Sequence, residues 1–345
     1  MFTSRAPTRL TNCWSWSLLE LERHGRCRRG RLGNMDDVKI SGTDDVTITL
    51  DRPQAINSLS GEMLGTIGEV VKRSPRSIDL SGAGERGYCS GADIRELRAL
   101  VLKDPEAAGD WLDGEYDVDA AIAEVHSGTA HLHGISMGGG LGLSLRLKRV
   151  EARDDLVLAM PETGIGLWPD VGVCFERSRA PRLVGRHMAM TGASIDAASA
   201  LWAGLVDEVV DADGNPAGVD PVDCELARDA VWIQDCYNTD DPIEVCRRLA
   251  DRPEVAARKA AEHIAARCPL SVAVALAAVI KAESASGLGE VLETDRALGR
   301  SFMRNSDFCE GVRAQLVDKD CNPHWSHESL ADVSTRQVEG MFDPS

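Results

Sequence analysis

Two carboxylic acids lie in a segment to which glycines and prolines give an irregular path. Glu162 follows an apolar run that is typical of a strand, and Asp170 comes eight residues later. Two carboxylates on one rigid loop can share proton transfer when burial raises the pKa of one of them. The same spacing is also compatible with two surface acids. The pair therefore predicts acid–base chemistry without defining the reaction.

Two glycine-containing loops could supply main-chain N–H groups to that chemistry. Gly91 precedes Ala92 and Asp93, and Asp93 is placed to cap the helix that follows. The glycine triplet 138–140 lies between a predicted strand and a predicted helix, where it favours a close approach of the backbone to a ligand. One N–H group from each loop would form an oxyanion hole for a carbonyl oxygen. A plain helix cap is the alternative for the first loop.

A competing motif overlaps the glycine triplet. Gly134, Ser136 and Gly138 fit the Gly-x-Ser-x-Gly pattern that presents a nucleophilic serine in α/β-hydrolases. That reading requires a histidine later in the chain. The histidines that follow the motif have no distinctive context: His187, His263, His324 and His327. A serine nucleophile is therefore the less favoured reading.

The elements around these loops alternate between strands and helices. Residues 46–50, 77–80, 130–135 and 157–160 have strand character, and Ser58 or Ser60 could cap a helix that continues to Val71. This alternation predicts an α/β fold. After a turn-rich linker at 211–216, residues 221–287 are alanine-rich with helical apolar spacing. We expect an α/β core over residues 35–210 and a helical C-terminal region over residues 211–345.

The composition of the chain limits the classes of partner that it can bind. The net charge of −17 argues against nucleic acid as a main partner, and no apolar run has the length of a membrane span. The ten cysteines are scattered, without Cys-x-x-Cys or a zinc-ligand spacing, so we expect no metal site and no disulfide framework.

The first 34 residues differ in charge from the rest of the chain. They contain seven Arg, two Glu and no Asp or Lys. We interpret them as a disordered or misassigned extension of a cytoplasmic protein. An Arg-rich, acid-poor leader can also be a transit peptide, in which case the protein would be mitochondrial.

Together and in this order, the three loops resemble the crotonase (enoyl-CoA hydratase/isomerase) superfamily, from about Val46 to the C-terminus. The segment 52–59 is similar to the family's CoA-contacting first turn. The resemblance implies a crotonase (ClpP/crotonase-like) spiral of ββα units, with the N–H groups of Ala92 and Gly139 holding a thioester carbonyl. The residues implied to contact CoA are Gln54, Ala55, Ile56, Ala92, Asp93 and Ile94.

One missing side chain and two further segments indicate the branch. Hydratases of the family have a catalytic Glu two residues after the glycine triplet, where this chain has Gly142. The segment 160–172, Glu115 in 114–116, residues 232–237 and the tail 310–325 resemble the 3-hydroxyisobutyryl-CoA hydrolase branch. This resemblance implies hydrolysis of 3-hydroxyisobutyryl-CoA to 3-hydroxyisobutyrate and CoA, a step of valine catabolism.

The same resemblance assigns roles. Glu162 would act as nucleophile or as base for water, and Asp170 would orient or exchange protons. The substrate-binding set would be Glu115, Gly139, Glu162 and Asp170. CoA would be part of the substrate, with no cofactor or metal, and a homo-oligomer is possible. Two alternatives stay open: a hydratase or isomerase of the same fold, and a non-catalytic protein that binds acyl-CoA or oligomerises.

Overall fold

The computed structural model describes residues 37–343. The predicted N-terminal extension, residues 1–34, lies outside the described residues. A six-stranded sheet, in the order β1-β2-β3-β4-β6-β8, is parallel except for the β1–β2 pair. Two further strands, β5 and β7, form a separate parallel pair. The strands are β1 Val38–Ser41, β2 Asp45–Leu50, β3 Ser77–Gly82, β4 Ser127–Leu132, β5 Ile135–Met137, β6 Arg149–Arg153, β7 Val157–Ala159 and β8 Glu208–Val210.

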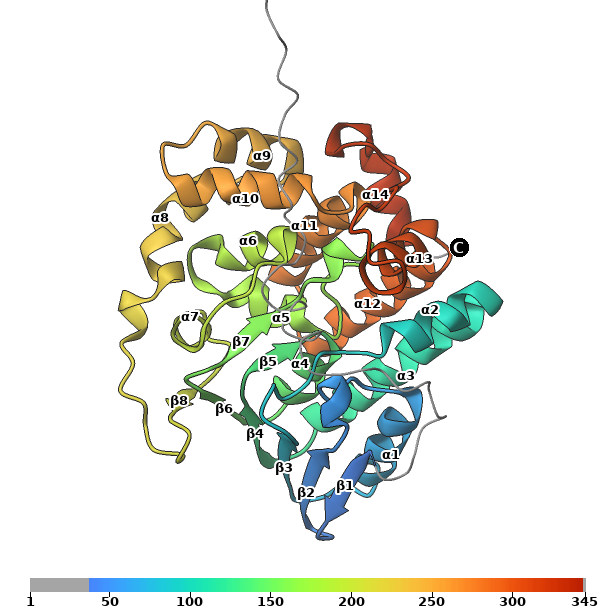
Figure 1. Cartoon of the computed structure of the whole chain (residues 1–345), viewed down its shortest axis with the longest axis vertical. Coiled ribbons are helices and arrows are strands. Elements are labelled where there is room, and N and C mark those ends of the chain that lie inside the picture. Colours follow the sequence, from blue (N-terminus) through green and yellow to red (C-terminus); the bar gives the residue numbers. More distant parts are fainter. Residues whose placement is uncertain (1–36, 344–345) are drawn as a thin grey trace, which may run out of the picture. The chain divides into compact units, whose positions relative to one another are not determined.

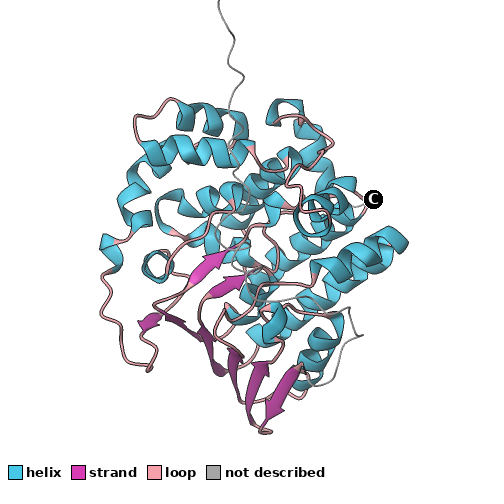
Figure 2. Cartoon of the chain, viewed as in Figure 1, coloured by secondary structure: helices cyan, strands magenta, loops and turns pink. Residues whose placement is uncertain are grey.

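The helices follow two patterns along the chain. Up to Val210 they alternate with strands, and after it the described chain contains only helices and connecting loops (Figures 1 and 2). The earlier helices are α1 Gly61–Val71, α2 Ile94–Lys103, α3 Pro105–Ala123, α4 Gly139–Ser144, α5 Val173–Arg179, α6 Val184–Thr191 and α7 Ala197–Trp202. The later helices are α8 Glu225–Tyr237, α9 Pro242–Ala250, α10 Val255–Ala265, α11 Pro269–Glu283, α12 Leu288–Met303, α13 Ser306–Val312 and α14 Thr335–Met341.

This arrangement is the predicted α/β fold with a helical C-terminal region. The expected strand at 46–50 is β2, and the expected helix ending at Val71 is α1, whose cap is Ser60. The expected strand 130–135 is in fact two strands. Gly134 has a φ of 47° between them, and the chain there leaves the large sheet for the small one. The division of the chain near residue 210 stays a prediction.

The polar residues within strands β3 and β4 lie on the outer face of the sheet and not in its core. In the sequence, His131 and His133 interrupt an otherwise apolar run, which favours hydrogen-bonded core histidines. The side chain of His131 is instead 42% exposed. Its two ring nitrogens lie 3.1 Å from Asp79 and 3.0 Å from Glu151, which belong to the two neighbouring strands. The alternate residues Leu80 and Ala130 face the core. Because strand side chains alternate between faces, one polar row here is compatible with a fully apolar inner face.

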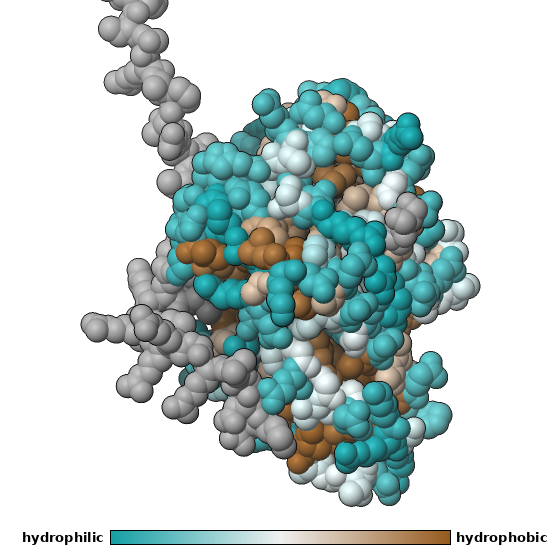
Figure 3. Space-filling model, turned by 90° about the vertical axis from the view of Figure 1, so that its right-hand side faces the viewer, coloured by the Kyte–Doolittle hydropathy of each residue, from teal (hydrophilic) through white to brown (hydrophobic). Residues whose placement is uncertain are grey.

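The surface agrees with the acidic composition. Figure 3 shows a largely hydrophilic face on which apolar groups are scattered between polar ones. Within residues 37–343 no single helix is long and apolar enough to cross a membrane, although α10 and α11, bent by 117°, meet that criterion as a pair. Seven of the described cysteines carry free thiols, and five of these are buried, as small apolar side chains often are.

Candidate active site

The two predicted N–H donors lie side by side. A Cβ atom built on Gly139 would lie 3.5 Å from the Ala92 nitrogen, and one built on Gly91 would lie 3.4 Å from the Gly139 nitrogen. Gly139 is the first residue of α4, so its N–H has no partner within the helix. Gly91, with a φ of 92°, and Gly138, with a φ of 54°, allow the two loops to approach this closely. The arrangement provides two adjacent donors for one oxygen.

The predicted first turn is held against the Ala92 loop. Asp93 caps α2 by accepting from the Glu96 N–H, and it also accepts from the Arg52 guanidinium at 2.9 Å. Of the residues predicted to contact CoA in this turn, Gln54 is exposed and Ala55 is half-buried. Ile56 is buried, and its carbonyl already accepts from the Ser90 N–H at 2.8 Å. Its N–H donates to the Pro53 carbonyl at 3.2 Å, so both polar main-chain groups of Ile56 are engaged within the protein. Ile94 begins α2 and is half-buried.

Glu162 lies beside these donors. It starts a short 3-10 turn, Glu162–Gly164, directly after β7. A Cβ atom on Gly138 would lie 3.2 Å from Glu162 Oε1. The side chain is 7% exposed. Burial, and next the negative charge of Asp170, raise the pKa of Glu162 to about 8. The Arg177 guanidinium, which is itself buried, opposes that rise.

Asp170 is equally buried but has a partner. Tyr116 of α3 donates its hydroxyl to Asp170 Oδ2 at 2.8 Å. Burial raises the pKa of Asp170 to about 6, and the Tyr116 hydrogen bond limits the rise by stabilising the charged form. Of the two acids, Asp170 therefore ionises first, and Glu162 holds its proton to higher pH.

Helix α3 brings a third acid to the donors. Glu115 is 1% exposed, and a Cβ atom on Gly139 would lie only 2.0 Å from its Oε1. Position 139 therefore accepts no side chain while Glu115 occupies this place. Burial, followed by the charges of nearby acids, raises the pKa of Glu115 well above its usual range. A protonated Glu115 could donate a hydrogen bond to a ligand.

A fourth acid fills the space beside Gly142. Asp119 lies one turn after Glu115 on α3 and is fully buried, with both carboxyl oxygens unpartnered within the described residues. Its Oδ2 lies 2.7 Å from the position of a Cβ on Gly142, as does Val171 Cβ. Burial raises the pKa of Asp119 well above its usual range, so its protonated form is favoured. The space next to Gly142 thus contains a carboxyl group that comes from another helix.

One of the two charged residues just beyond the active loop is paired. Glu176 of α5 pairs with Arg146 at 2.7 Å, and the Arg146 side chain is only 1% exposed. Arg177, the next residue, is buried, and its Nε and Nη1 have no hydrogen-bond partner within the described residues. Ser136 is also accounted for: it lies within β5, is buried, and donates its hydroxyl to the His133 carbonyl at 3.3 Å. A serine at the centre of a strand is not the exposed apex that a nucleophile elbow requires.

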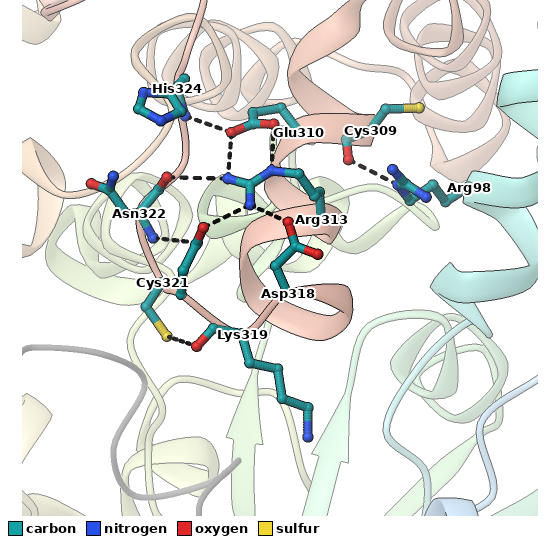
Figure 4. A network of polar contacts seen from close by, with 10 residues as sticks. Arg98, Cys309, Glu310, Arg313, Asp318, Lys319, Cys321, Asn322 and His324 are labelled. Carbon is teal, nitrogen blue, oxygen red and sulfur yellow. Dashed lines mark hydrogen bonds and ion pairs between the residues drawn. The ribbon is translucent and has the colours of Figure 1, made fainter.

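The C-terminal tail is held together by a network of polar contacts around Arg313. Arg313 binds the carboxylates of Glu310, Asp318 and Asp320 and the carbonyl of Asn322. Figure 4 shows Glu310, Asp318 and Asn322 around its guanidinium. Arg98 of α2 donates to the Cys309 carbonyl at 3.0 Å. The tail therefore packs beside the helix that follows the Ala92 loop.

Comparison with known proteins shows which family the chain belongs to. The model of the enoyl-CoA hydratase/isomerase family matches residues 46–219 and 213–342. The chain belongs to this family. It is a crotonase-family acyl-CoA enzyme, in agreement with the resemblance seen in the sequence.

Individual relatives carry different names. The 3-hydroxyisobutyryl-CoA hydrolase of Gallus gallus is 30% identical over 86% of both chains. The structure of a carnitinyl-CoA dehydratase from Mycobacterium thermoresistibile is 33% identical, with a TM-score of 0.83 over 90% of this chain and 97% of that one. An enoyl-CoA hydratase from Rhodobacter sphaeroides is 26% identical, with a TM-score of 0.84 over 89% and 97%.

The sequence reading found the loops of this site but not the residues that support them. It did not single out Tyr116, Asp119 or Asp295. A signal existed for Asp119: Glu115 and Asp119 are four residues apart in a helix whose neighbouring positions Val118 and Ile122 are apolar and buried. Two acids on the buried stripe of one helix indicate a polar site within the core.

Proposed function

We propose that this protein hydrolyses the thioester of a short 3-hydroxyacyl-CoA, and specifically 3-hydroxyisobutyryl-CoA. The observation that carries the proposal is the buried pair Glu162 and Asp170 next to the N–H groups of Ala92 and Gly139. The roughly 30% identity to 3-hydroxyisobutyryl-CoA hydrolases over most of the chain supports the choice of substrate.

The geometry suggests the following division of labour. The thioester oxygen accepts from the Ala92 and Gly139 N–H groups, which stabilise the negative charge of the tetrahedral state. Ionised Glu162 attacks the carbonyl carbon or removes a proton from an attacking water. In the water route the C–S bond breaks, and the CoA sulfur leaves as the thiol with the proton that Glu162 took from water. In the covalent route the C–S bond breaks as the acyl group forms an anhydride with Glu162. A water that gives a proton to Asp170 then hydrolyses this anhydride to the free acid, and Asp170 passes the proton to the CoA thiolate. Asp170, fixed by Tyr116, orients water and exchanges protons with it.

The 3-hydroxyl group would select the substrate. Glu115 and Asp170 are its candidate partners, because Glu115 lies at Gly139 and Asp170 keeps one carboxyl oxygen beyond the Tyr116 bond. An acyl group without the hydroxyl would leave these buried polar groups without a ligand partner. Buried polar groups that lose their ligand partner make an enzyme discriminate strongly against a substrate without the hydroxyl.

A thioesterase screen tests the proposal. CoA release is measured across short acyl-CoAs with and without a 3-hydroxyl, using the wild type, Glu162→Gln and Asp170→Asn. We expect release from 3-hydroxyisobutyryl-CoA and a loss of two or more orders of magnitude in both variants. Glu124→Gln, at an exposed position on the end of α3, is the matched control. A folded wild type that releases no CoA above background refutes the proposal, and acyl-CoA binding without turnover favours the non-catalytic alternative.

A second candidate reaction is supported by Asp119. Gly142 removes the carboxylate that a hydratase carries on α4, but Asp119 places a carboxylic acid at the same spot from α3. Reversible loss of water from a 3-hydroxyacyl-CoA would then be possible. Ionised Glu162 takes the proton from C2, the C3–O bond breaks, and protonated Asp119 supplies a proton to the leaving hydroxyl. The dehydratase relative at 33% identity is named for a reaction of this kind.

Crotonyl-CoA hydration separates the two candidates. The hydrolase proposal predicts essentially no hydration. Hydration that disappears in Asp119→Asn, while CoA release does not exceed background, would favour the second candidate. Asn keeps the size of the side chain, so the comparison isolates the acidic proton.

Assembly and location remain predictions. We expect a cytoplasmic protein, or a mitochondrial one if residues 1–34 act as a transit peptide; the hydrolase relatives are named as mitochondrial. A homo-oligomer is possible, and its size in solution can be measured by light scattering.

A further inference from the structure

The backbone around Asp170 is held in an unusual conformation. Val171 has a φ of 51° and Gly172 a φ of 73°, and the Val173 N–H closes a turn onto the Asp170 carbonyl at 3.0 Å. Glycine adopts such angles freely, but a positive φ at a β-branched residue is rare and strained. The surrounding structure must therefore hold this turn in place.

A carboxyl group from the C-terminal helical region contacts both ends of this segment. Asp295 of α12 is 1% exposed. Its Oδ1 accepts from the Trp168 indole N–H at 3.0 Å, and its Oδ2 accepts from the Gly172 N–H at 2.8 Å. Trp168 lies two residues before Asp170 and Gly172 two residues after it. One oxygen of the Asp295 carboxyl therefore holds the chain before Asp170, and the other holds the chain after it.

The same helix adds an apolar contact to this clamp. Phe302, two turns after Asp295 on α12, stacks on the Trp168 ring with the centroids 4.9 Å apart and the planes at 18°. The indole is therefore restrained both by its N–H and by its face. The Asp170 carboxylate itself is held by Tyr116 of α3, a helix that packs against α12.

We propose that Asp295 is a positioning residue for catalysis, which fixes the strained turn at Val171 and Gly172 and thereby the direction of the Asp170 carboxylate. Asp295 makes no hydrogen bond to Asp170 or Glu162 in the described structure, so it acts through the backbone. The proposal rests on the proposed role of Asp170 in acyl-CoA turnover. Removing the clamp should lower kcat and leave KM almost unchanged, because the CoA turn and the oxyanion donors belong to other elements.

The test is a double-mutant cycle between Asp295→Asn and Trp168→Phe. An Asn has one acceptor oxygen, so its amide nitrogen must face one of the two N–H donors, and that donor is then left without an acceptor. If the oxygen stays with Gly172, the amide nitrogen opposes the indole N–H. Removing the indole N–H with Phe relieves this conflict and keeps an aromatic ring against Phe302. We therefore expect Asp295→Asn to lower kcat about 30-fold or more, and the double variant to recover at least threefold over it.

Glu293→Gln is the matched control, because it makes the same change of a carboxylate to an amide two residues earlier on α12, at an exposed position. It should keep the wild-type kcat. A folded Asp295→Asn variant with kcat within threefold of the wild type overturns the proposal, as does a double variant that is no better than the single one. If Asp295→Asn does not fold, Trp168→Phe alone decides: kcat should fall several-fold at constant KM, and an unchanged kcat overturns the proposal.

Amide hydrogen exchange keeps this test independent of the proposed function. The Gly172 N–H should be protected in the wild type and should exchange at least tenfold faster in Asp295→Asn, with no change in Glu293→Gln. If the wild type turns over no acyl-CoA, the proposed function fails while the exchange experiment still tests the clamp. Unchanged protection in Asp295→Asn would show that Asp295 does not hold the turn.

Discussion

Replacing Glu162 by Gln should stabilise the protein, and the gain should grow with pH. The pKa of Glu162 is raised from an ordinary value of 4.5 to about 8 in the folded state. Below about pH 4.5 the group is protonated in both the folded and unfolded states. As the pH rises from there to about 8, the unfolded state loses the proton and the folded state keeps it. The free energy of unfolding of the wild type therefore falls through this window, and a glutamine at this position has no such term.

The magnitude follows from the same values. A tenfold change in proton affinity is worth about 1.4 kcal/mol, so a pKa near 8 in the folded state costs the wild type about 5 kcal/mol in total above pH 8. Between about pH 6 and about pH 9, the advantage of Glu162→Gln should increase by about 3 kcal/mol. Contacts that differ between Glu and Gln shift both measurements equally and cancel in this comparison.

Urea unfolding of both proteins at the two pH values measures this difference. Other buried acids, such as Asp295, titrate in the wild type and in the variant, and their contributions largely cancel. An advantage that does not change with pH, or that shrinks as the pH rises, would refute the conclusion that burial holds Glu162 protonated. A stabilised variant without activity would also show that the carboxylate is kept for function at the expense of stability.

Three further outcomes are expected. If ionised Glu162 carries the reaction, kcat/KM should rise with pH through a midpoint near 8 and level off above it. A profile that is flat from pH 6 to 9 would contradict this. Tyr116→Phe removes the hydrogen bond that limits the pKa of Asp170, so that pKa should rise above about 6 and kcat should fall about tenfold, as a kinetic pH profile would show. Gly139→Ala should reduce turnover at least 100-fold, because its Cβ would overlap Glu115 Oε1, and Glu115→Ala in the same chain should recover folding, measured by thermal unfolding, but not activity.

Local patterns in the sequence indicated which loops the structure brings together, and the roles of their residues stay a prediction. The glycines at 91 and 138–140 indicate close backbone contacts wherever they occur, and Glu162 and Asp170 lie in a segment that no regular element could contain. The structure brings these loops together as expected. The cap at Asp93 is confirmed, since local hydrogen bonding alone determines it.

The residues behind the loops could not be predicted in the same way. The spacing of Glu115 and Asp119 indicates a polar site within the core, but only the packing of α3 against α4 puts the Asp119 carboxyl at Gly142. Asp295 lies 123 residues from Gly172, and no local pattern joins the two. His131 of β4 and His133 just after it show the opposite error. They look anomalous in a strand that is assumed to be buried on both faces, yet one face of this sheet carries a polar row.

The stacking of Phe302 on Trp168 bears on how this chain can be divided or recombined. A chimaera that takes its α/β core from one family member and its C-terminal helices from another would join a Trp168 and a Phe302 that never evolved to fit each other. Its core strands could form normally while the loop that holds Asp170 lost its support. Exchange of segments between members should therefore carry the loop and α12 as one unit, even though more than a hundred residues separate them in the chain.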